Sequence, residues 1–204
     1  MERLLLVRHG QSEQHVTEIT GGWTDASLTE LGHEQAKRVA VRIAKMVPDG
    51  EVKLFSSDLG RARETAEYIA RRVDVRLVVD GGLRELNNGA AAGLTTAEAR
   101  AIELPRTDPP WDWVHYPGGE SWGAMTDRVS ACMERLARDV DHTAIVVTHA
   151  GSAHAVIHWW LRLSDASRKR VSFELDPASV TVLSINRFGE RTIVRLNDTA
   201  HLER

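Results

Sequence analysis

Short apolar runs alternate along the chain with segments of helical periodicity, and this alternation restricts the possible folds more than any other feature. The run TAIVVTH at 143–149 is nearly continuous in apolar residues, as expected for a strand buried on both faces. Further strands are predicted at 4–7, 52–57 and 75–79, and a terminal antiparallel hairpin at 179–185 and 191–197. Strands separated by helices form a mostly parallel sheet with helices on both faces. We therefore predict an α/β fold, a three-layer αβα sandwich with an antiparallel edge.

The helices between these strands are predicted from the spacing of apolar residues. Ser27 and Glu30 form a candidate capping box for the first helix, and Pro48 and Gly50 mark its end. A long loop with two short helical stretches is expected to fill much of 81–120. The other predicted helices cover 59–72, the segment from Ser121 to Leu136, and 152–163.

Composition sets broad limits on function. The chain has 204 residues, enough for one domain over 1–204 with a sizeable core. Its formal net charge is −3 and it has no long block of like charges, which argues against nucleic acid and membrane surfaces as partners. Cys132 is the only cysteine, and the apolar run at 4–7 is too short for a signal peptide or a membrane span. These features predict a cytoplasmic protein and give no indication of its oligomeric state.

Polar side chains that follow the predicted strands should gather at one edge of the sheet, because the carboxyl ends of parallel strands meet there. Ligands of such sheets bind outside that edge. The chain places histidines, arginines and one carboxylate in these positions. They are Arg8 and His9 after the first strand, Arg61 and Arg63 after the second, Glu85 after the third, and His149 after the strand at 143–149.

These residue types suit phosphoryl transfer. Arginine presents planar donors that match phosphate oxygens, and it keeps its charge. The positive field of the arginines keeps a nearby histidine neutral, and neutral imidazole is a nucleophile. The arginines would stabilise the transferred phosphoryl group, as magnesium does in kinases. No paired Cys-x-x-Cys or comparable metal motif accompanies the set, so we expect neither a metal nor a cofactor.

Each of these residues, taken alone, also fits an ordinary structural role. Arg8 and His9 are common residue types at the end of a strand. Glu85 suits a solvated loop, and His149 suits a core position with a satisfied side chain. The functional interpretation rests on their convergence, because each residue follows a predicted strand at the same edge of the sheet.

Seven stretches of the sequence resemble the histidine phosphatase superfamily, which includes the cofactor-dependent phosphoglycerate mutases. They span nearly the whole chain in the family's order, and together they are highly specific. They are LVRHGQSE (6–13), GGWTDASLTELGHEQAKR (21–38), SSDLGRARETA (56–66), LRELNNGAAAGLT (83–95), PGGES (117–121), VVTHAG (146–151) and LNDTAHL (196–202). The resemblance implies the phosphoglycerate mutase-like fold.

The resemblance also implies roles for individual residues. His9 would be the phosphorylated nucleophile, Arg8 and Arg61 would clamp the phosphoryl oxygens, and His149 would hydrogen-bond the same group. Glu85 would donate a proton to the leaving oxygen and later activate water. Gly22 and Trp23, from the second stretch, are implied as substrate or phosphate contacts. Arg63 is the weaker candidate for a clamp, because it lies about 200° around the helix from Arg61.

Some positions depart from the family pattern. His15 stands where the family usually has an asparagine of the phosphate pocket; imidazole also donates a hydrogen bond, with a pH response of its own. Ala91 and Ala92 replace the Trp-Glu pair of many family phosphatases, which leaves a smaller loop after Glu85.

The departures also separate two activities within the family. Phosphoglycerate mutases carry a tyrosine at the position of Asn88, a lysine at that of Thr96, and a longer insertion with paired arginines. This chain lacks the lysine and the insertion. We therefore expect a phosphatase that hydrolyses a small-molecule phosphomonoester through a phosphohistidine. A mutase-type phosphoryl transferase is the alternative.

Two further hypotheses come from other features. His154 and His158 lie four residues apart on one helical face, which is a metal-ligand spacing, but no third ligand or HExxH pattern accompanies them. Packing within the helix is the simpler interpretation. A non-catalytic module that binds a phosphorylated ligand would normally lack the nucleophile or the acid, and this chain has candidates for both.

Three tryptophans, Trp111, Trp113 and Trp122, lie close together in a proline-rich region. They fit either a stiff wall that faces the substrate or a small satellite core beneath the long loop. The sequence leaves both interpretations open.

Overall fold

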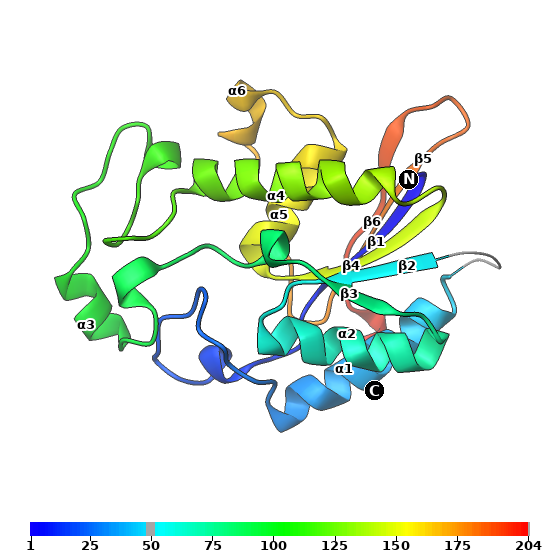
Figure 1. Ribbon diagram of the computed structural model, residues 1–204, viewed down its shortest axis with the longest axis horizontal. Coiled ribbons are helices and arrows are strands. Elements are labelled where there is room, and N and C mark those ends of the chain that lie inside the picture. The colour runs from blue at the N-terminus through cyan, green and yellow to red at the C-terminus, as the bar shows by residue number, and fades with distance from the viewer. Residues whose placement is uncertain (48–51, 204) are drawn as a thin grey trace.

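The computed structural model describes residues 1–47 and 52–203 and contains a six-stranded sheet in the order β3-β2-β4-β1-β5-β6 (Figure 1). β1 to β4 are mutually parallel, and β5 is antiparallel to both of its neighbours. The strands are β1 (Arg3–Arg8), β2 (Val52–Ser56), β3 (Leu77–Val79), β4 (Thr143–Thr148), β5 (Val180–Ile185) and β6 (Arg191–Asp198).

The centre of the sheet is formed by β4 and β1, whose side chains are apolar on both faces. All residues of β4 are buried, and so are the four apolar residues of β1. The parallel register pairs Arg8 with Thr148, and it pairs Ser56 with Val147. The residues that follow β1, β2 and β4 therefore emerge side by side at one edge, the carboxyl edge of the sheet.

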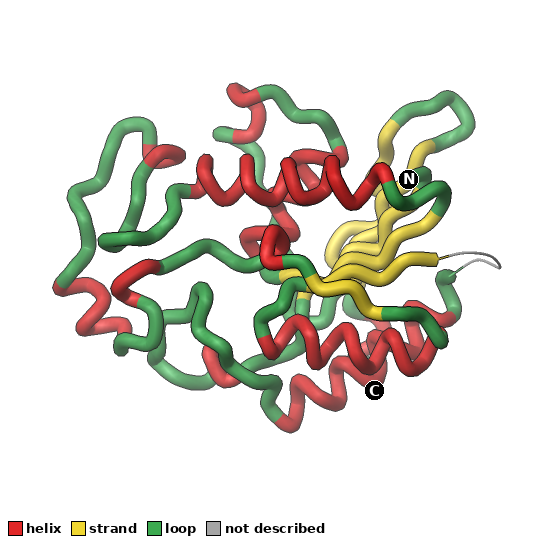
Figure 2. Tube along the Cα trace, viewed as in Figure 1, coloured by secondary structure: helices red, strands yellow, loops and turns green. Residues whose placement is uncertain are grey.

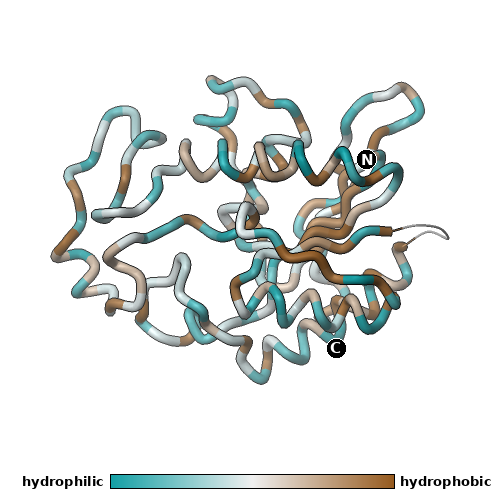
Figure 3. The backbone as a smooth tube through the Cα atoms, viewed as in Figure 1, coloured by the Kyte–Doolittle hydropathy of each residue, from teal (hydrophilic) through white to brown (hydrophobic). Residues whose placement is uncertain are grey.

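Helices cover the two faces of the sheet in pairs. α1 (Glu30–Ala44) and α2 (Gly60–Val73) pack on one face, and α4 (Trp122–Arg138) and α5 (Ala150–Trp160) pack on the other (Figures 1 and 2). Leu5 and Val7 of β1 face the first pair, whereas Leu4 and Leu6 face the second. The strands form the hydrophobic centre between the two layers, as Figure 3 shows.

A long segment between β3 and α4 extends beyond the carboxyl edge and includes α3 (Thr96–Ala101) (Figure 1). It otherwise consists of loops and three short 3-10 turns, at 81–83, 89–91 and 110–112. An isolated bridge between Ile19 and Thr95 connects this segment to the loop before α1. A second bridge joins Val114 and Ser121 within the segment. α6 (Asp165–Arg168) lies on the side of α4 and α5. These segments surround the residues at the strand ends.

The predicted fold class is confirmed, but several element boundaries were wrong. Thr29, not Ser27, is the N-cap of α1, because the Thr29 hydroxyl accepts the Gly32 N–H. α1 ends at Ala44, and the predicted stop at Pro48 and Gly50 lies outside the described residues.

Two other elements differ in extent. The strand predicted at 75–79 begins only at Leu77, where pairing with Leu54 of β2 starts. The helix predicted at 152–163 begins at Ala150, directly after the N-cap His149, and ends at Trp160. Arg162 then adopts a left-handed conformation with φ of 54°, which continuation of the helix does not allow.

Within residues 1–47 and 52–203, no helix is both long and apolar enough to cross a membrane. α4 has 17 residues and carries arginines in its last turn.

The observed cap leads to a matched pair of substitutions. Thr29→Ala should lower the free energy of unfolding by about 1 kcal/mol, because the Gly32 N–H loses its partner. Ser27→Ala should change it by less than about 0.5 kcal/mol, because Ser27 is exposed and its hydroxyl makes no hydrogen bond within the described residues. Urea denaturation of both variants measures the difference. Equal losses would contradict the assignment of the cap.

Candidate active site

His9 follows the last residue of β1, and its backbone N–H donates to the Thr148 carbonyl at 2.9 Å. The ring is 3% exposed, and Nδ1 lies 2.7 Å from the Gly10 carbonyl oxygen. A carbonyl only accepts, so Nδ1 carries the proton and Nε2 keeps its lone pair. Burial, and next the charge of Arg61, lower the pKa of His9 well below its ordinary value. The ring is therefore neutral near pH 7, and the lone pair on Nε2 can act as a nucleophile.

Arg61 is the second residue of α2, and its guanidinium is held by the loop before α1. Nη1 donates to the Thr24 carbonyl at 2.9 Å, and Nη2 donates to the Gly22 carbonyl at 2.8 Å. These bonds direct Nε toward His9 Nε2 at 3.3 Å. Burial lowers the pKa of Arg61 to about 10, opposed by the charge of Glu85, so the side chain stays cationic at neutral pH.

Gly22 takes part in this arrangement through its backbone. Its φ of 87° lies in the left-handed region, and a Cβ there would approach the Leu86 carbonyl oxygen to 2.9 Å. Only glycine lets the chain turn here so that its carbonyl meets Arg61. The predicted role of Gly22 as a direct ligand contact stays a prediction, because its described contact is with Arg61.

Arg8 and His15 approach each other beside His9. Arg8 Nη1 donates to the Leu175 carbonyl, and Arg8 Nη2 lies 2.7 Å from His15 Nε2. On the other side of the ring, the Ser12 N–H donates to His15 Nδ1 at 2.9 Å. A neutral imidazole has one lone pair and cannot accept from both groups. The Ser12 hydroxyl also lies 3.1 Å from Nδ1, so the tautomer of the ring decides whether Nε2 accepts from Arg8 or Nδ1 accepts from the Ser12 N–H.

The contact with Ser12 bears on the charge of His15. Burial, and next the charge of Arg8, lower the pKa of His15. A protonated ring would also set its Nδ1 proton against the Ser12 N–H. These features favour a neutral His15 ring, which has one N–H donor and one lone pair.

His149 caps the start of α5 and is fully buried. Its ring centroid is 5.0 Å from that of His9, and its Nε2 lies 2.9 Å from Ser57 Oγ. Ser57 Oγ also accepts from the Leu59 N–H, and its second lone pair and its proton both remain for the contact with His149 Nε2. Burial, and next the charge of Arg61, lower the pKa of His149 well below its ordinary value.

Two buried side-chain nitrogens of the site have no partner among the described residues. They are Nε of Arg8, which is a donor, and Nδ1 of His149. Buried polar groups are almost always hydrogen-bonded in folded proteins, because leaving them unpaired costs about 1–3 kcal/mol. An unpaired arginine donor beside a neutral histidine and a second arginine suits an oxyanion such as a phosphoryl group.

Glu85 is held in place by two backbone amides. Its Oε1 accepts the Leu86 N–H at 2.9 Å, and its Oε2 accepts the Gly151 N–H at 3.0 Å, in the first turn of α5. A Cβ at Gly151 would lie 2.5 Å from Glu85 Oε1, so only glycine leaves room for the carboxyl group. The charge of Glu85 also acts on both Arg8 and Arg61, which places it in the same site.

The backbone around Glu85 is fixed by Trp23 and Arg128. The Trp23 indole donates to the Glu85 carbonyl at 2.6 Å, and Arg128 donates to the same carbonyl at 3.1 Å. Arg128 also binds the carbonyls of Gly82 and Arg84 and both oxygens of Glu120. Trp23, predicted as a ligand contact, therefore has a described role in positioning Glu85.

The structure brings together His9, Arg8, Arg61, His149 and Glu85, as expected from the convergence of the strand ends, and places His15 beside Arg8 and His9. Arg63 is excluded, because it points to the exposed side of α2 and faces Glu67 at 3.8 Å. Ser57 and Arg128 were not predicted. Ser57 lies in a quoted motif, but its role depends on contact with a histidine 92 residues away.

A cleft of about 550 Å³ opens beside Glu85 and begins at Ala150 and Gly151. Trp111 and Trp122 line it, together with prolines and the segment 168–174. Trp113 is not among its lining residues: the indole donates to the Leu104 carbonyl at 3.1 Å and stacks on His115. Thus two of the three tryptophans line the cleft, and the third packs within the loop. Ala91 is buried, and neither Ala91 nor Ala92 is among the lining residues of the cleft.

His154 and His158 hold the far wall of this cleft to α5. His154 Nδ1 accepts the Phe173 N–H at 3.2 Å, and His158 Nε2 donates to the Val171 carbonyl at 3.0 Å. The centroids of the His154 and His158 rings are 4.1 Å apart. Within the described part of the chain, no group of three or more His, Cys, Asp or Glu residues is placed to hold a metal ion. The pair is engaged in packing and backbone hydrogen bonds.

A neutral buried histidine between arginines, at the carboxyl edge of a mostly parallel sheet, is the arrangement expected of an α/β protein that binds phosphoryl groups. Comparisons with known proteins agree. A model of the histidine phosphatase superfamily (branch 1) matches residues 4–199. The chain therefore belongs to branch 1 of the histidine phosphatase superfamily.

Individual relatives support this assignment. Phosphoglycerate mutase-like protein 4 of Arabidopsis thaliana is 32% identical over 211 residues, which cover 98% of this chain and 86% of the relative. A probable phosphoglycerate mutase of Escherichia coli O1:K1 is 31% identical over 196 residues, with 85% of this chain and 86% of the relative covered. The structure of mycobacterial glucosyl-3-phosphoglycerate phosphatase with VO3 matches with a TM-score of 0.80 and 28% identity, over 98% of this chain and 100% of that chain.

The buried histidines should make the fold sensitive to acid. Burial, and next the charge of His158, lower the pKa of His154 from 6.5 to about 4. As the pH falls below 6.5, His154 is protonated in the unfolded chain before it is protonated in the folded chain. The free energy of unfolding therefore decreases from pH 6.5 down to about pH 4. His154→Gln should recover up to about 2 kcal/mol of the loss between pH 6.5 and pH 5, because each pKa unit corresponds to about 1.4 kcal/mol.

Urea denaturation at a series of pH values measures this effect. Glutamine still offers an oxygen to the Phe173 N–H, which guards against simple loss of the loop contact. His142→Gln, at an exposed position, is the control. An acid response of His154→Gln equal to that of the wild type would contradict the assigned burial effect.

Proposed function

We propose that this protein is a phosphomonoester hydrolase that transfers the phosphoryl group of a small-molecule substrate to His9 and then to water. One observation carries the proposal. Neutral His9 presents Nε2 beside Arg61, and the unpaired nitrogens Arg8 Nε and His149 Nδ1 lie in the same buried site. This set matches a phosphoryl group under attack by a nitrogen nucleophile.

In the first step, the lone pair of His9 Nε2 attacks phosphorus and the bond from phosphorus to the leaving oxygen breaks. A proton on the Glu85 carboxyl group passes to that oxygen, and an alcohol departs. The His9 ring becomes cationic when Nε2 is phosphorylated. The Gly10 carbonyl, which accepts from Nδ1, stabilises this charge.

In the second step, water attacks the phosphorus of phosphohistidine. The Glu85 carboxylate accepts the proton of the water, the bond between phosphorus and Nε2 breaks, and inorganic phosphate leaves. Arg8, Arg61, His15 and His149 supply hydrogen-bond donors to the phosphoryl oxygens in both steps. Glu85 ends protonated, and His9 ends neutral.

The arginines supply the positive charge that the transition state needs, so we propose that the reaction is independent of metal ions. Activity should survive exhaustive chelation, and a loss restored by added zinc or magnesium would refute metal independence.

Three further expectations from the sequence are proposals. They are a single domain over residues 1–204, a cytoplasmic location, and a small phosphoester as the partner rather than nucleic acid or membrane.

Three relatives bear on the choice of activity. The structural relative is named for hydrolysis of glucosyl-3-phosphoglycerate, whereas the curated relatives carry mutase names. Phosphate release, rather than isomerisation of 3-phosphoglycerate, is expected here. In the structure, Thr96, the position of the mutase lysine, begins α3 and is bonded to the Glu18 carbonyl.

The central test is to trap the intermediate. Rapid alkaline quenching with a labelled phosphoester should leave acid-labile label on the wild-type protein, as phosphohistidine is stable in base. His9→Ala should carry no label and lose hydrolysis by at least about 1000-fold, since removal of a nucleophile leaves only binding and electrostatic effects. His142→Ala, at an exposed histidine, should retain the label. Label that persists in His9→Ala would disprove the assignment.

Glu85 has a test of its own. A general acid matters most for poor leaving groups, so Glu85→Gln should slow an alkyl phosphate by about 100-fold and p-nitrophenyl phosphate far less. Gly151→Ala should show the same pattern, because its Cβ would displace the carboxyl group. The measurement is kcat/KM for both substrates in each variant. Equal slowing of the two substrates would point to a structural role for Glu85.

A further inference from the structure

The cleft beside Glu85 is where the leaving group must lie, if the proposed function holds. A proton donor must come within hydrogen-bond reach of the leaving oxygen. The Glu85 carboxyl group is bonded to the Gly151 N–H, and Gly151 lines the inner end of the cleft. The body of the substrate therefore extends from Glu85 into the cleft. The residues that line the cleft then select the substrate.

Aromatic side chains form the walls next to this inner end. Trp111 comes from the 3-10 turn 110–112, Trp122 is the first residue of α4, and Phe173 comes from the segment after α6. These rings are held by their surroundings. A Cβ at Gly123 would lie 2.9 Å from the Trp111 indole nitrogen, and the Trp122 ring lies 6.1 Å from that of His154. Rigid aromatic walls favour a flat or apolar ring in the ligand.

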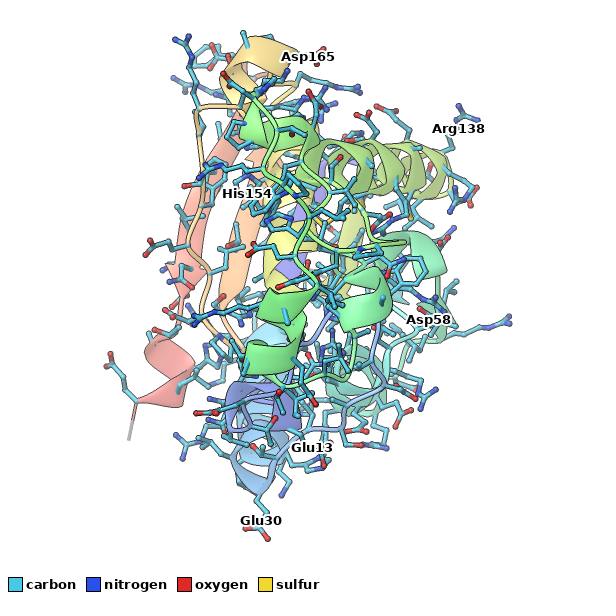
Figure 4. The ribbon with its side chains drawn as sticks, turned by 90° about the vertical axis from the view of Figure 1, so that its left-hand side faces the viewer. Glu13, Glu30, Asp58, Arg138, His154 and Asp165 are labelled. Carbon is cyan, nitrogen blue, oxygen red and sulfur yellow. The ribbon has the colours of Figure 1, made fainter. Side chains whose placement is uncertain are left out.

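Cationic side chains line the cleft along the segment that follows α6. Arg168 is already paired with Asp165 and Asp127. Lys169 and Arg170 line the cleft and make no ion pair within the described residues. The charge of Lys169 contributes, after that of Arg168, to the lowered pKa of Asp165. Figure 4, which faces the carboxyl edge of the sheet, shows Asp165 of α6 above His154.

The remaining charges of the lining do not cancel these two cations. Glu174 is the carboxylate that lines the cleft, and His154 is neutral because burial lowers its pKa to about 4. Exposed lysine and arginine without acidic partners bind anions, and arginine matches a carboxylate or phosphate with two donors. The outer part of the cleft therefore suits a negative group.

We propose that the cleft selects phosphomonoesters whose leaving group carries a ring and, beyond the ring, a second anionic group. The ring would lie between Trp111, Trp122 and Phe173, and the anion would bind Arg170 and Lys169. A volume of about 550 Å³ accommodates a body of one or two rings. This inference rests on the proposed function, because it uses Glu85 to place the leaving group.

The test compares matched substrates that differ only in the outer charge. The probes are 4-carboxyphenyl phosphate and 6-carboxy-2-naphthyl phosphate, each paired with its neutral carboxamide. For the ring size that reaches the cations, the wild type should prefer the acid by about tenfold in kcat/KM, as expected for one charge-assisted hydrogen bond. In the double variant with Lys169→Gln and Arg170→Gln, this ratio should fall to about 1. A ratio below about 2 for both ring sizes, or a preference that persists in the double variant, would overturn the proposal.

Control variants separate local contacts from general effects. Arg187→Gln removes a cation at the tip of the β5–β6 hairpin and should keep the acid preference. Trp111→Leu should lower kcat/KM for the aryl carboxylates relative to an acyclic phosphoester, whereas Trp113→Leu should not, because Trp113 packs against Leu104 and His115. Equal effects of the two tryptophan substitutions would also overturn the proposal.

Binding measurements distinguish failure of this inference from failure of the proposed function. The corresponding arylmethanephosphonates, in which a CH2 group replaces the ester oxygen, cannot be hydrolysed, and their binding is followed by tryptophan fluorescence. If the wild type hydrolyses no phosphoester, the proposed function fails, and the acid-to-amide ratio of phosphonate affinities still decides the selectivity of the cleft. If it hydrolyses p-nitrophenyl phosphate but shows no acid preference in rate or affinity, only the present inference fails.

Discussion

The buried environment of His9 is the constraint on which the rest of the site depends. A histidine next to Arg61 and Arg8 cannot hold a proton on Nε2, because burial and the neighbouring charges both oppose it. The Gly10 carbonyl keeps the single proton on Nδ1. Charge, burial and tautomer therefore agree in presenting one nitrogen lone pair. The cost of keeping two arginines in such a site is offset by backbone carbonyls and by the charge of Glu85.

The sheet supplies the rigidity that this arrangement needs. β1 lies between β4 and β5, so the backbone at Arg8 and His9 is bonded to Ser179 and Thr148 on its two sides. A nucleophile at the end of such a strand has little freedom to move away from its partners. The loops on the carboxyl edge provide the remaining groups, and each is tied to the strand ends by specific contacts. Trp23 and Arg128 perform this task for the segment that carries Glu85.

The site around His9 and the cleft share the first turn of α5. His149 precedes that turn and lies against His9, and Gly151 within it binds Glu85 and lines the cleft. Further along the same helix, His154 and His158 hold the segment 168–174 that forms the far wall. A single helix thus positions residues of the site and residues of the cleft.

The sequence by itself determined the fold class, the order of strands and helices, and the group of residues at the strand ends. These follow from local patterns, since apolar runs and helical spacing are properties of neighbouring residues. Its errors were local too: the choice of Ser27 over Thr29 as the cap depends on which hydroxyl meets the first free amide of α1. That choice requires backbone angles that residue types alone do not specify.

Only the tertiary structure decided the tautomer of His9, the contacts of His15 with Arg8 and Ser12, and the positioning roles of Ser57 and Arg128. It also separated Trp113 from Trp111 and Trp122, which the sequence left together. The physical reason is the same in each case. Hydrogen bonds and burial involve partners far apart in the chain, as with Ser57 and His149, which lie 92 residues apart. Spacing along a sequence shows which groups reach one edge of a sheet, but the loops between them determine which atoms meet.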